Sequence, residues 1–97
     1  MGKIEKLNRD IARLEAKIEK LYQEIEEAKE RKERKELTPA EYTQIKQKNS
    51  LEIKHLRTSI RWKEKARYIT EKKMRVKAEK KEKKRKEREA KRKSQEE

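Results

Sequence analysis

One series of cationic side chains has the spacing of a phosphate-binding helix face. Its members recur every three or four residues with no carboxylate among them: Lys54, Arg57, Arg61, Lys65, Tyr68, Lys72 and Arg75. On an α-helix this basic stripe covers about 30 Å, close to one turn of B-DNA. Cations that neutralise phosphates release counterions, and the tyrosine could stack on a base. We expect the stripe to contact nucleic acid or another polyanion; the alternative is a helix face that is simply solvated.

A basic cluster follows the stripe and extends the positive surface toward the C-terminus. It contains Lys80, Lys81, Lys83, Lys84 and Arg85. Such clusters bind phosphates or, in a nucleated cell, resemble a localisation signal. Neither set of cations distinguishes DNA from RNA, so the sequence predicts phosphate contacts without direct reading of bases.

The sequence gives little support for a catalytic site. His55 is the only histidine, and Glu52 and Ser59 lie three residues before it and four after it. This is the nearest approach to a catalytic triad, but a solvated helix supplies neither a pocket nor an oxyanion hole. With no cysteine and Gly2 as the only glycine, thiolate metal sites and glycine-rich phosphate loops are absent. We expect no enzymatic activity, metal, cofactor or small-molecule substrate.

A separate apolar stripe lies well over 100° around the helix from the face expected to pack in the hairpin. It consists of Leu51, Trp62, Ala66, Ile69 and Val76. In one interpretation the packed face moves onto this stripe after Ile60. In the other, the stripe binds a second protomer or an acidic partner protein. Because a lone two-helix hairpin is marginally stable, we favour a homodimer.

A heptad repeat predicts the first of the helices that position these residues. Its apolar residues alternate in steps of three and four: Ile4, Leu7, Ile11, Leu14, Ile18, Leu21, Ile25 and Ala28. Four heptads in register are typical of a coiled coil. We therefore expect a coiled-coil helix over residues 3–36.

The next residues predict a capped turn at 37–40. Thr38 suits an N-cap, Pro39 the first helical position, and Glu41 the third position of a capping box. Leu37 and Tyr42 occupy the positions of a hydrophobic staple. A short loop favours antiparallel neighbours, so we expect the chain to fold back here; a kinked continuous rod is the alternative.

The second helix is predicted to be longer than the first. Residues 39–76 should pair with helix 3–36 through Tyr42, Ile45, Asn49, Ile53, Leu56 and Ile60. Residues 77–97 should extend beyond it as a charged helix, supported by Glu-before-Lys pairs such as Glu79 with Lys83, and fray to disorder toward Glu97. The expected fold is all-α: an antiparallel helical hairpin, or coiled coil, with a long basic second helix that extends past the first.

The composition limits the partners that such a fold could have. Of 97 residues, 29% are apolar and 55% charged, and the net charge is +13. Residues 1–37 carry eleven Lys or Arg and ten Asp or Glu, whereas residues 38–97 carry twenty-two and ten. Partners should therefore be polyanions, with nucleic acid first and an acidic protein second. The sequence contains no run of eighteen apolar residues, so it predicts no membrane span. The basic helix also has too little apolar surface to insert into a bilayer.

Together these features predict a non-enzymatic, basic coiled-coil hairpin that binds DNA or RNA mainly through phosphates. The alternative is a scaffolding or inhibitor coiled coil that docks on an acidic protein. No signal peptide is apparent, so we expect a cytoplasmic protein associated with a nucleoid or ribonucleoprotein, or a nuclear one in a eukaryote or its virus.

Overall fold

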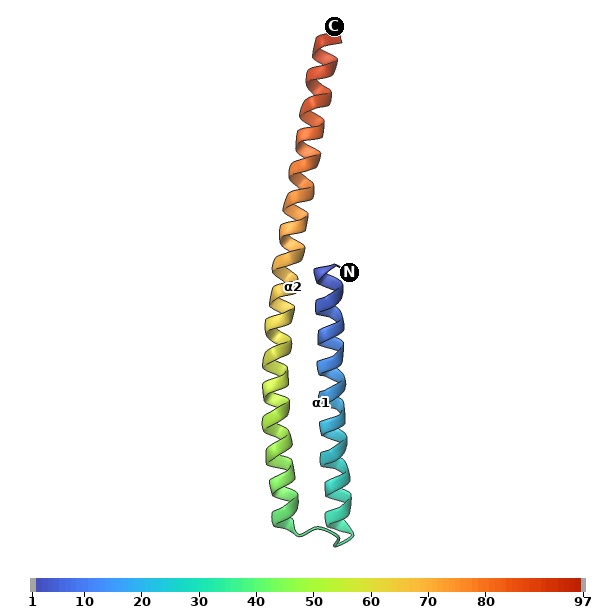
Figure 1. Cartoon of the computed structure of the whole chain (residues 1–97), viewed down its shortest axis with the longest axis vertical. Helices are drawn as coiled ribbons and strands as arrows, with labels where there is room; N and C mark the ends of the chain where they lie inside the picture. Colours follow the sequence, from blue (N-terminus) through green and yellow to red (C-terminus); the bar gives the residue numbers. More distant parts are fainter. Residues whose placement is uncertain (1, 97) are drawn as a thin grey trace.

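A computed structural model describes residues 2–96, and within that range the chain forms two α-helices and no strand. Helix α1 spans Lys3–Glu33 and helix α2 spans Pro39–Glu96. The helices lie side by side, and α2 continues far beyond the start of α1 (Figure 1). The molecule is accordingly elongated, with extents of 90 × 18 × 16 Å. The prediction of an all-helical chain with two helices is confirmed.

Contacts between the two helices pair residues near the end of α1 with residues near the start of α2, and residues near the start of α1 with later residues of α2. Next to the loop, the Lys32 ammonium lies 4.5 Å from the centroid of the Tyr42 ring. At the far end, Arg67 Nη1 donates a hydrogen bond to Asn8 Oδ1 at 2.8 Å. Helix α2 passes the start of α1 near residues 66–77 (Figure 1).

Helix α1 buries one line of apolar side chains against α2. Ile11 and Ala28 are the most buried, with exposed fractions of 6% and 4%. The rest of the line is half-buried: Ile4, Leu7, Leu14, Ile18, Leu21 and Ile25. These are the eight residues of the predicted heptad series, so burial on α1 recurs every seven residues.

On α2 the buried line, here called the seam, begins with predicted residues and then continues through polar ones. Asn49, Ile53 and Ile60 are buried. Past Ile60 the half-buried residues are Lys63, Ala66, Arg67 and Thr70. Trp62 is 67% exposed and Ile69 is 42% exposed. The seam therefore does not move onto the apolar stripe after Ile60, and of that stripe Ala66 alone is half-buried.

Polar contacts explain how the seam continues without apolar side chains. Lys63 Nζ lies 3.4 Å from Asp10 Oδ2, one turn of α2 before the Arg67 contact described above. Within the apolar part, the Asn49 amide donates to the Leu21 carbonyl oxygen at 3.3 Å and to a Glu24 carboxylate oxygen at 3.1 Å. Asn49, Lys63 and Arg67 thus each have a partner on α1, whereas the Thr70 hydroxyl donates to the Ala66 carbonyl oxygen within α2 at 2.8 Å.

Helix α1 ends at Glu33, three residues before the predicted end at position 36. Lys35 adopts a left-handed conformation with φ of 63°. The Lys35 N–H donates to the Lys32 carbonyl at 3.0 Å, and the Glu36 N–H donates to the Arg31 carbonyl at 2.8 Å. These are the two hydrogen bonds of a Schellman motif, a helix end usually built on glycine. The chain forms it here with a lysine.

The start of α2 is held by the predicted capping box. The Glu41 N–H donates to Thr38 Oγ1 at 3.1 Å, and the Thr38 N–H donates to Glu41 Oε1 at 3.3 Å. Pro39 is the first residue of α2, where no N–H is needed. Leu37 and Tyr42 are both half-buried, as a hydrophobic staple requires.

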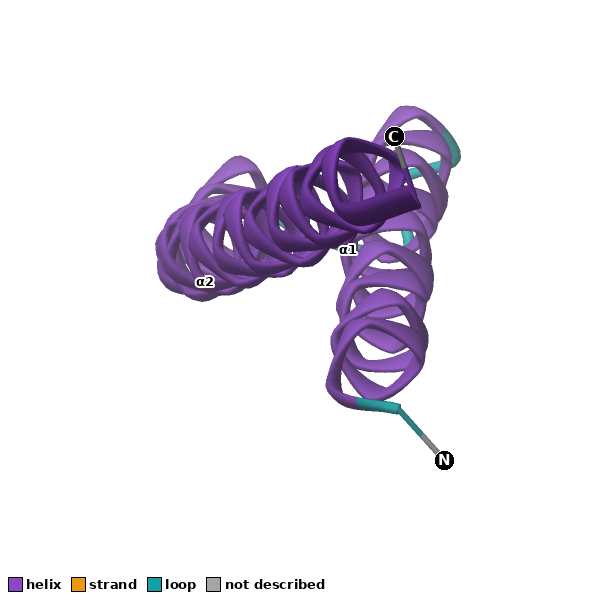
Figure 2. Ribbon diagram, turned by 90° about the horizontal axis from the view of Figure 1, so that it is seen from above, coloured by secondary structure: helices purple, strands orange, loops and turns teal. Residues whose placement is uncertain are grey.

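Beyond α1, helix α2 runs on alone through Glu96, and every described side chain from Glu71 to Ser94 is exposed. In this extension (residues 77–97) the ion pair that forms among the described side chains joins Arg85 to Glu82 at 2.6 Å, not a Glu and a Lys four residues apart. Both views show the extension leaning toward the side on which α1 lies (Figures 1 and 2). Fraying of this segment stays a prediction, and Glu97 lies outside the described residues.

Candidate polyanion-binding faces

All seven residues of the basic stripe lie on the exposed surface of α2. Among the described side chains, residues 2–94, no ion pair involves one of its six cations. Cations elsewhere do pair, as Lys63 does with Asp10 and Arg34 with Glu36 at 3.4 Å. The stripe therefore presents positive charge that no carboxylate contact neutralises.

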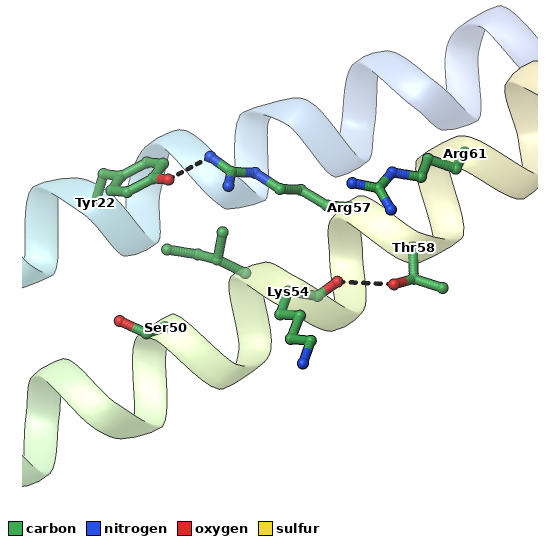
Figure 3. A pocket seen from close by; sticks show the side chains of 7 residues that line it. Tyr22, Ser50, Lys54, Arg57, Thr58 and Arg61 are labelled. Atoms are coloured by element: carbon green, nitrogen blue, oxygen red, sulfur yellow. Dashed lines mark hydrogen bonds between the residues drawn. The ribbon is translucent and has the colours of Figure 1, made fainter.

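Arg57 is the stripe residue that α1 holds in place. Its guanidinium donates a hydrogen bond to the Tyr22 hydroxyl and lies 5.7 Å from the centroid of the Tyr22 ring (Figure 3). Lys54, one turn earlier, points away from Tyr22 in the same view. These side chains line a shallow groove between α1 and α2, together with Ser50, Ile53, Thr58 and Arg61. Sequence reasoning missed Tyr22, which directly follows the half-buried heptad residue Leu21 and so flanks the seam.

An acidic strip on α1 occupies the same side of the hairpin as the basic stripe. Glu5, Glu19, Glu26 and Glu33 recur at multiples of seven residues, on the flank of α1 that also carries Tyr22. Because Tyr22 touches Arg57, this flank adjoins the basic stripe. The strip is not evident from the nearly neutral charge of the first 37 residues, because most cations of α1 lie on its other flank. A polyanion on the stripe should therefore lie along the outer side of α2, away from α1.

Residues 77–93 of the extension divide lengthwise into two halves of different charge. At about 100° per residue, one half of the helix carries eight cations and no carboxylate: Lys77, Lys80, Lys81, Lys84, Arg85, Arg88, Lys91 and Arg92. The other half carries four carboxylates among three lysines: Glu79, Glu82, Glu87, Glu89, Lys83, Lys86 and Lys93. Of the predicted cluster, four residues lie on the all-basic half, and Lys83 lies among the glutamates.

The all-basic half follows the line of the seam beyond α1. Counting seven residues at a time from Thr70 gives Lys77, Lys84 and Lys91, and from Arg67 it gives Met74, Lys81 and Arg88. Since α1 starts beside residues 66–77, this half is uncovered from about that point. The stripe and the all-basic half thus form two separate faces of α2.

The apolar stripe remains largely exposed. Trp62, Ile69 and Val76 recur every seven residues and are 67%, 42% and 43% exposed, and Leu51 is exposed as well. Lys65 Nζ lies 5.6 Å from the Trp62 ring centroid. The rest of the rim is also basic, because lysines line the shallow surface around Ile69 and Val76: Lys72, Lys73, Lys77 and Lys80. The stripe is therefore an apolar line with a positively charged border.

The remaining chemistry-bearing residues form no site within the described part of the chain. His55, Glu52 and Ser59 are all exposed on α2. No group of three or more His, Cys, Asp or Glu residues is placed to hold a metal ion among the described residues. Neither α1 nor α2, as far as they are described, has an apolar stretch long enough to cross a membrane.

Comparison of the chain with protein-family models, with curated proteins and with solved structures finds no match. A functional assignment must therefore rest on the surfaces described above. Of these, the two basic faces of α2 are the most distinctive, since both lack carboxylates and both are open to solvent.

Proposed function

We propose that this chain is a non-enzymatic helical hairpin that binds nucleic acid, DNA or RNA, mainly through phosphate contacts. The observation that carries the proposal is the set of exposed cations on α2. In the basic stripe no described carboxylate pairs with them, and over residues 77–93 of the extension one half of the helix has no carboxylate. Mixed-sign surfaces are the rule for solvated helices, so segregation of this kind favours a polyanionic ligand.

In this proposal, α1 serves as a brace that pairs with α2 as an antiparallel coiled coil. Support comes from burial that recurs every seven residues on α1, and on α2 at Tyr42, Asn49, Leu56, Lys63 and Thr70. Support also comes from the cross-helix contacts, which join Lys32 to Tyr42 at one end of α1 and Asn8 to Arg67 at the other. A braced helix holds its cations in a fixed line, which lowers the entropic cost of binding a regular array of phosphates.

Binding should depend weakly on base sequence. Apart from Arg57, which contacts Tyr22, and Lys65, which lies beside Trp62, the cations are long, exposed side chains with no described contact that would direct them to base edges, which suits phosphate contact. Tyr68, 60% exposed within the stripe, is placed to stack on an unpaired base. Association should therefore be driven by counterion release and tolerate many sequences.

Charge removal on α2, compared with charge removal on α1, tests the proposal. Replacing Lys77, Lys84 and Arg88 with Gln removes three cations of the all-basic half. Replacing Arg13, Lys17 and Lys20 with Gln removes three exposed cations from α1 and should leave the fold intact, since Gln, Lys and Arg have similar helix propensities. In fluorescence anisotropy with a labelled duplex, the first variant should lower the salt slope of log affinity by about 2–3, at roughly 0.9 per contact. Equal losses in the two variants would show that only net charge matters.

The apolar stripe supports a second candidate function, the binding of an acidic partner protein. Trp62 and Ile69 are exposed, and their lysine border matches an amphipathic helix with acidic flanks. Replacing both residues with Asp should abolish such an interaction and leave nucleic-acid retention unchanged. Persistence of both activities in the double variant would remove this candidate.

Self-association is also part of the proposal, because the hairpin has a small core. Among the described residues, five side chains are buried: Ile11, Ala28, Asn49, Ile53 and Ile60. A second copy on the apolar stripe would bring the two lysine borders together, so dimerisation there should strengthen as salt screens the repulsion. Nucleic-acid binding has the opposite dependence. Molar mass from light scattering at low and high salt tests the homodimer; a monomer under both conditions would exclude it.

A further inference from the structure

We propose that a single chain bridges two separate nucleic-acid duplexes, with one bound to the basic stripe of residues 54–75 and the other to the all-basic half of the extension. The inference rests on the proposed function and adds an activity to it. It follows from the directions of the two faces, which a summed charge does not reveal.

The two faces point to nearly opposite sides of α2. Because α2 is one uninterrupted helix from Pro39 to Glu96, residue numbers fix directions around its axis. At about 100° per residue, the mean direction of the stripe and that of the all-basic half differ by roughly 170°. Their centres, near residues 65 and 85, are about 30 Å apart along the axis.

Neither face continues into the other, because each line of residues changes character near residue 76. The stripe contains Lys54, Arg61, Tyr68 and Arg75 at seven-residue intervals, and the same interval then gives Glu82 and Glu89. A duplex that follows the stripe therefore meets carboxylates on the extension, with Glu82 partly neutralised by Arg85 at 2.6 Å. The line of the seam passes instead from residues covered by α1 to exposed lysines and arginines.

One duplex that lies alongside α2 cannot occupy both faces. The 30 Å between their centres corresponds to about nine base pairs, whereas the persistence length of DNA is about 150 base pairs. A duplex would have to turn almost halfway around a single α-helix within that length. On the stripe side, the acidic strip of α1 further restricts any path toward the seam. Two independent duplexes satisfy both faces without bending.

A capture experiment with the full chain tests the inference. One duplex carries biotin and the other a fluorophore, and both are much shorter than the persistence length of about 150 base pairs. The stripe variant replaces Arg61, Lys65 and Lys72 with Gln, and the extension variant replaces Lys77, Lys84 and Arg88 with Gln.

A matched control replaces Lys83, Lys86 and Lys93 with Gln, which removes three cations from the mixed half of the same segment. All nine positions are exposed, and Gln preserves helix propensity, so each variant should fold. Circular dichroism of each variant checks helix content.

The wild-type chain should retain the fluorescent duplex on the biotinylated one. The stripe and extension variants should each still shift a single duplex, but their capture should fall at least about tenfold, and that of the control less than about twofold. Wild-type binding without capture would overturn the inference and leave the proposed function standing. Absence of single-duplex binding would overturn both. Unchanged capture by either one-face variant would also overturn it, because a dimer that uses one face per protomer then explains bridging.

Discussion

Lys35 and Thr38, both between α1 and α2, have opposite effects on the stability of the hairpin. Lys35 has φ of 63°, a left-handed conformation that is strained for a residue with a Cβ. Thr38 relieves the start of α2 by accepting the Glu41 N–H at 3.1 Å. The cap was predictable because its side chains carry the signal themselves. The helix end at Glu33 was not, because the glycine that normally marks a Schellman motif is replaced by lysine.

Replacing Lys35 with Gly should stabilise the hairpin. Relief of left-handed strain, about 1–2 kcal/mol, exceeds the entropic cost of the glycine, so a gain of roughly 0.5–1 kcal/mol is expected in urea denaturation followed by circular dichroism. Lys35→Ala is the control, since it keeps the Cβ and should bring no gain. If both variants lose stability equally, the side chain of Lys35 matters more than its backbone.

Replacing Thr38 with Ala should destabilise the hairpin by about 1 kcal/mol, since the Glu41 N–H loses its acceptor at the helix start. Thr38→Ser keeps the hydroxyl and should stay close to wild type in the same measurement. An unchanged midpoint in Thr38→Ala would show that Pro39 alone sets the start of α2.

At the scale of the elements, the paired part of α2 combines an apolar seam that the sequence predicts with a polar one that it does not. Apolar periodicity locates Ile53 and Ile60, which are 3% and 9% exposed. It fails from Lys63 onward, because a lysine that pairs with Asp10 looks like any surface lysine in one sequence. Only the packing of α1 against α2 brings such partners together.

Asn49 is the polar residue within the apolar part, and it limits stability there. Replacing it with Leu should raise stability by about 1 kcal/mol, because burial of the leucine outweighs the two lost hydrogen bonds. Buried Asn residues often fix pairing register in coiled coils, so the variant should also exchange its buried amide protons faster. Thermal denaturation and hydrogen exchange measure the two effects. A loss of stability would mean that the bonds to Leu21 and Glu24 contribute more than the packing gained.

Deleting residues 77–97 should leave the hairpin folded and weaken its binding. The described side chains of this segment are all exposed, so the free energy of unfolding should change by less than about 0.5 kcal/mol. Affinity for a duplex should fall, with a shallower dependence on salt, because the eight cations of the all-basic half are lost. A large drop in melting temperature would show that the extension supports the hairpin.

At the scale of the whole molecule, the continuity of α2 separates two positive faces that look like one in the sequence. Both groups of cations are evident from residue types alone. Their divergence is seen only when directions are compared around one helix that runs unbroken past residue 76, as α2 does. The sequence predicts this continuation as a charged helix over residues 77–97 that frays toward Glu97. The acidic strip of α1 was hidden for a similar reason, since its glutamates balance cations on the opposite flank.

The central claim is that exposed cations on α2 bind nucleic-acid phosphates. The most direct measurement is the affinity of the full chain for a labelled duplex across a series of salt concentrations. With six or more phosphate contacts, a plot of log affinity against log salt should be linear with a slope of about −5 or steeper, and base sequence should matter little. Absent binding, or an affinity that does not change with salt, would contradict the account.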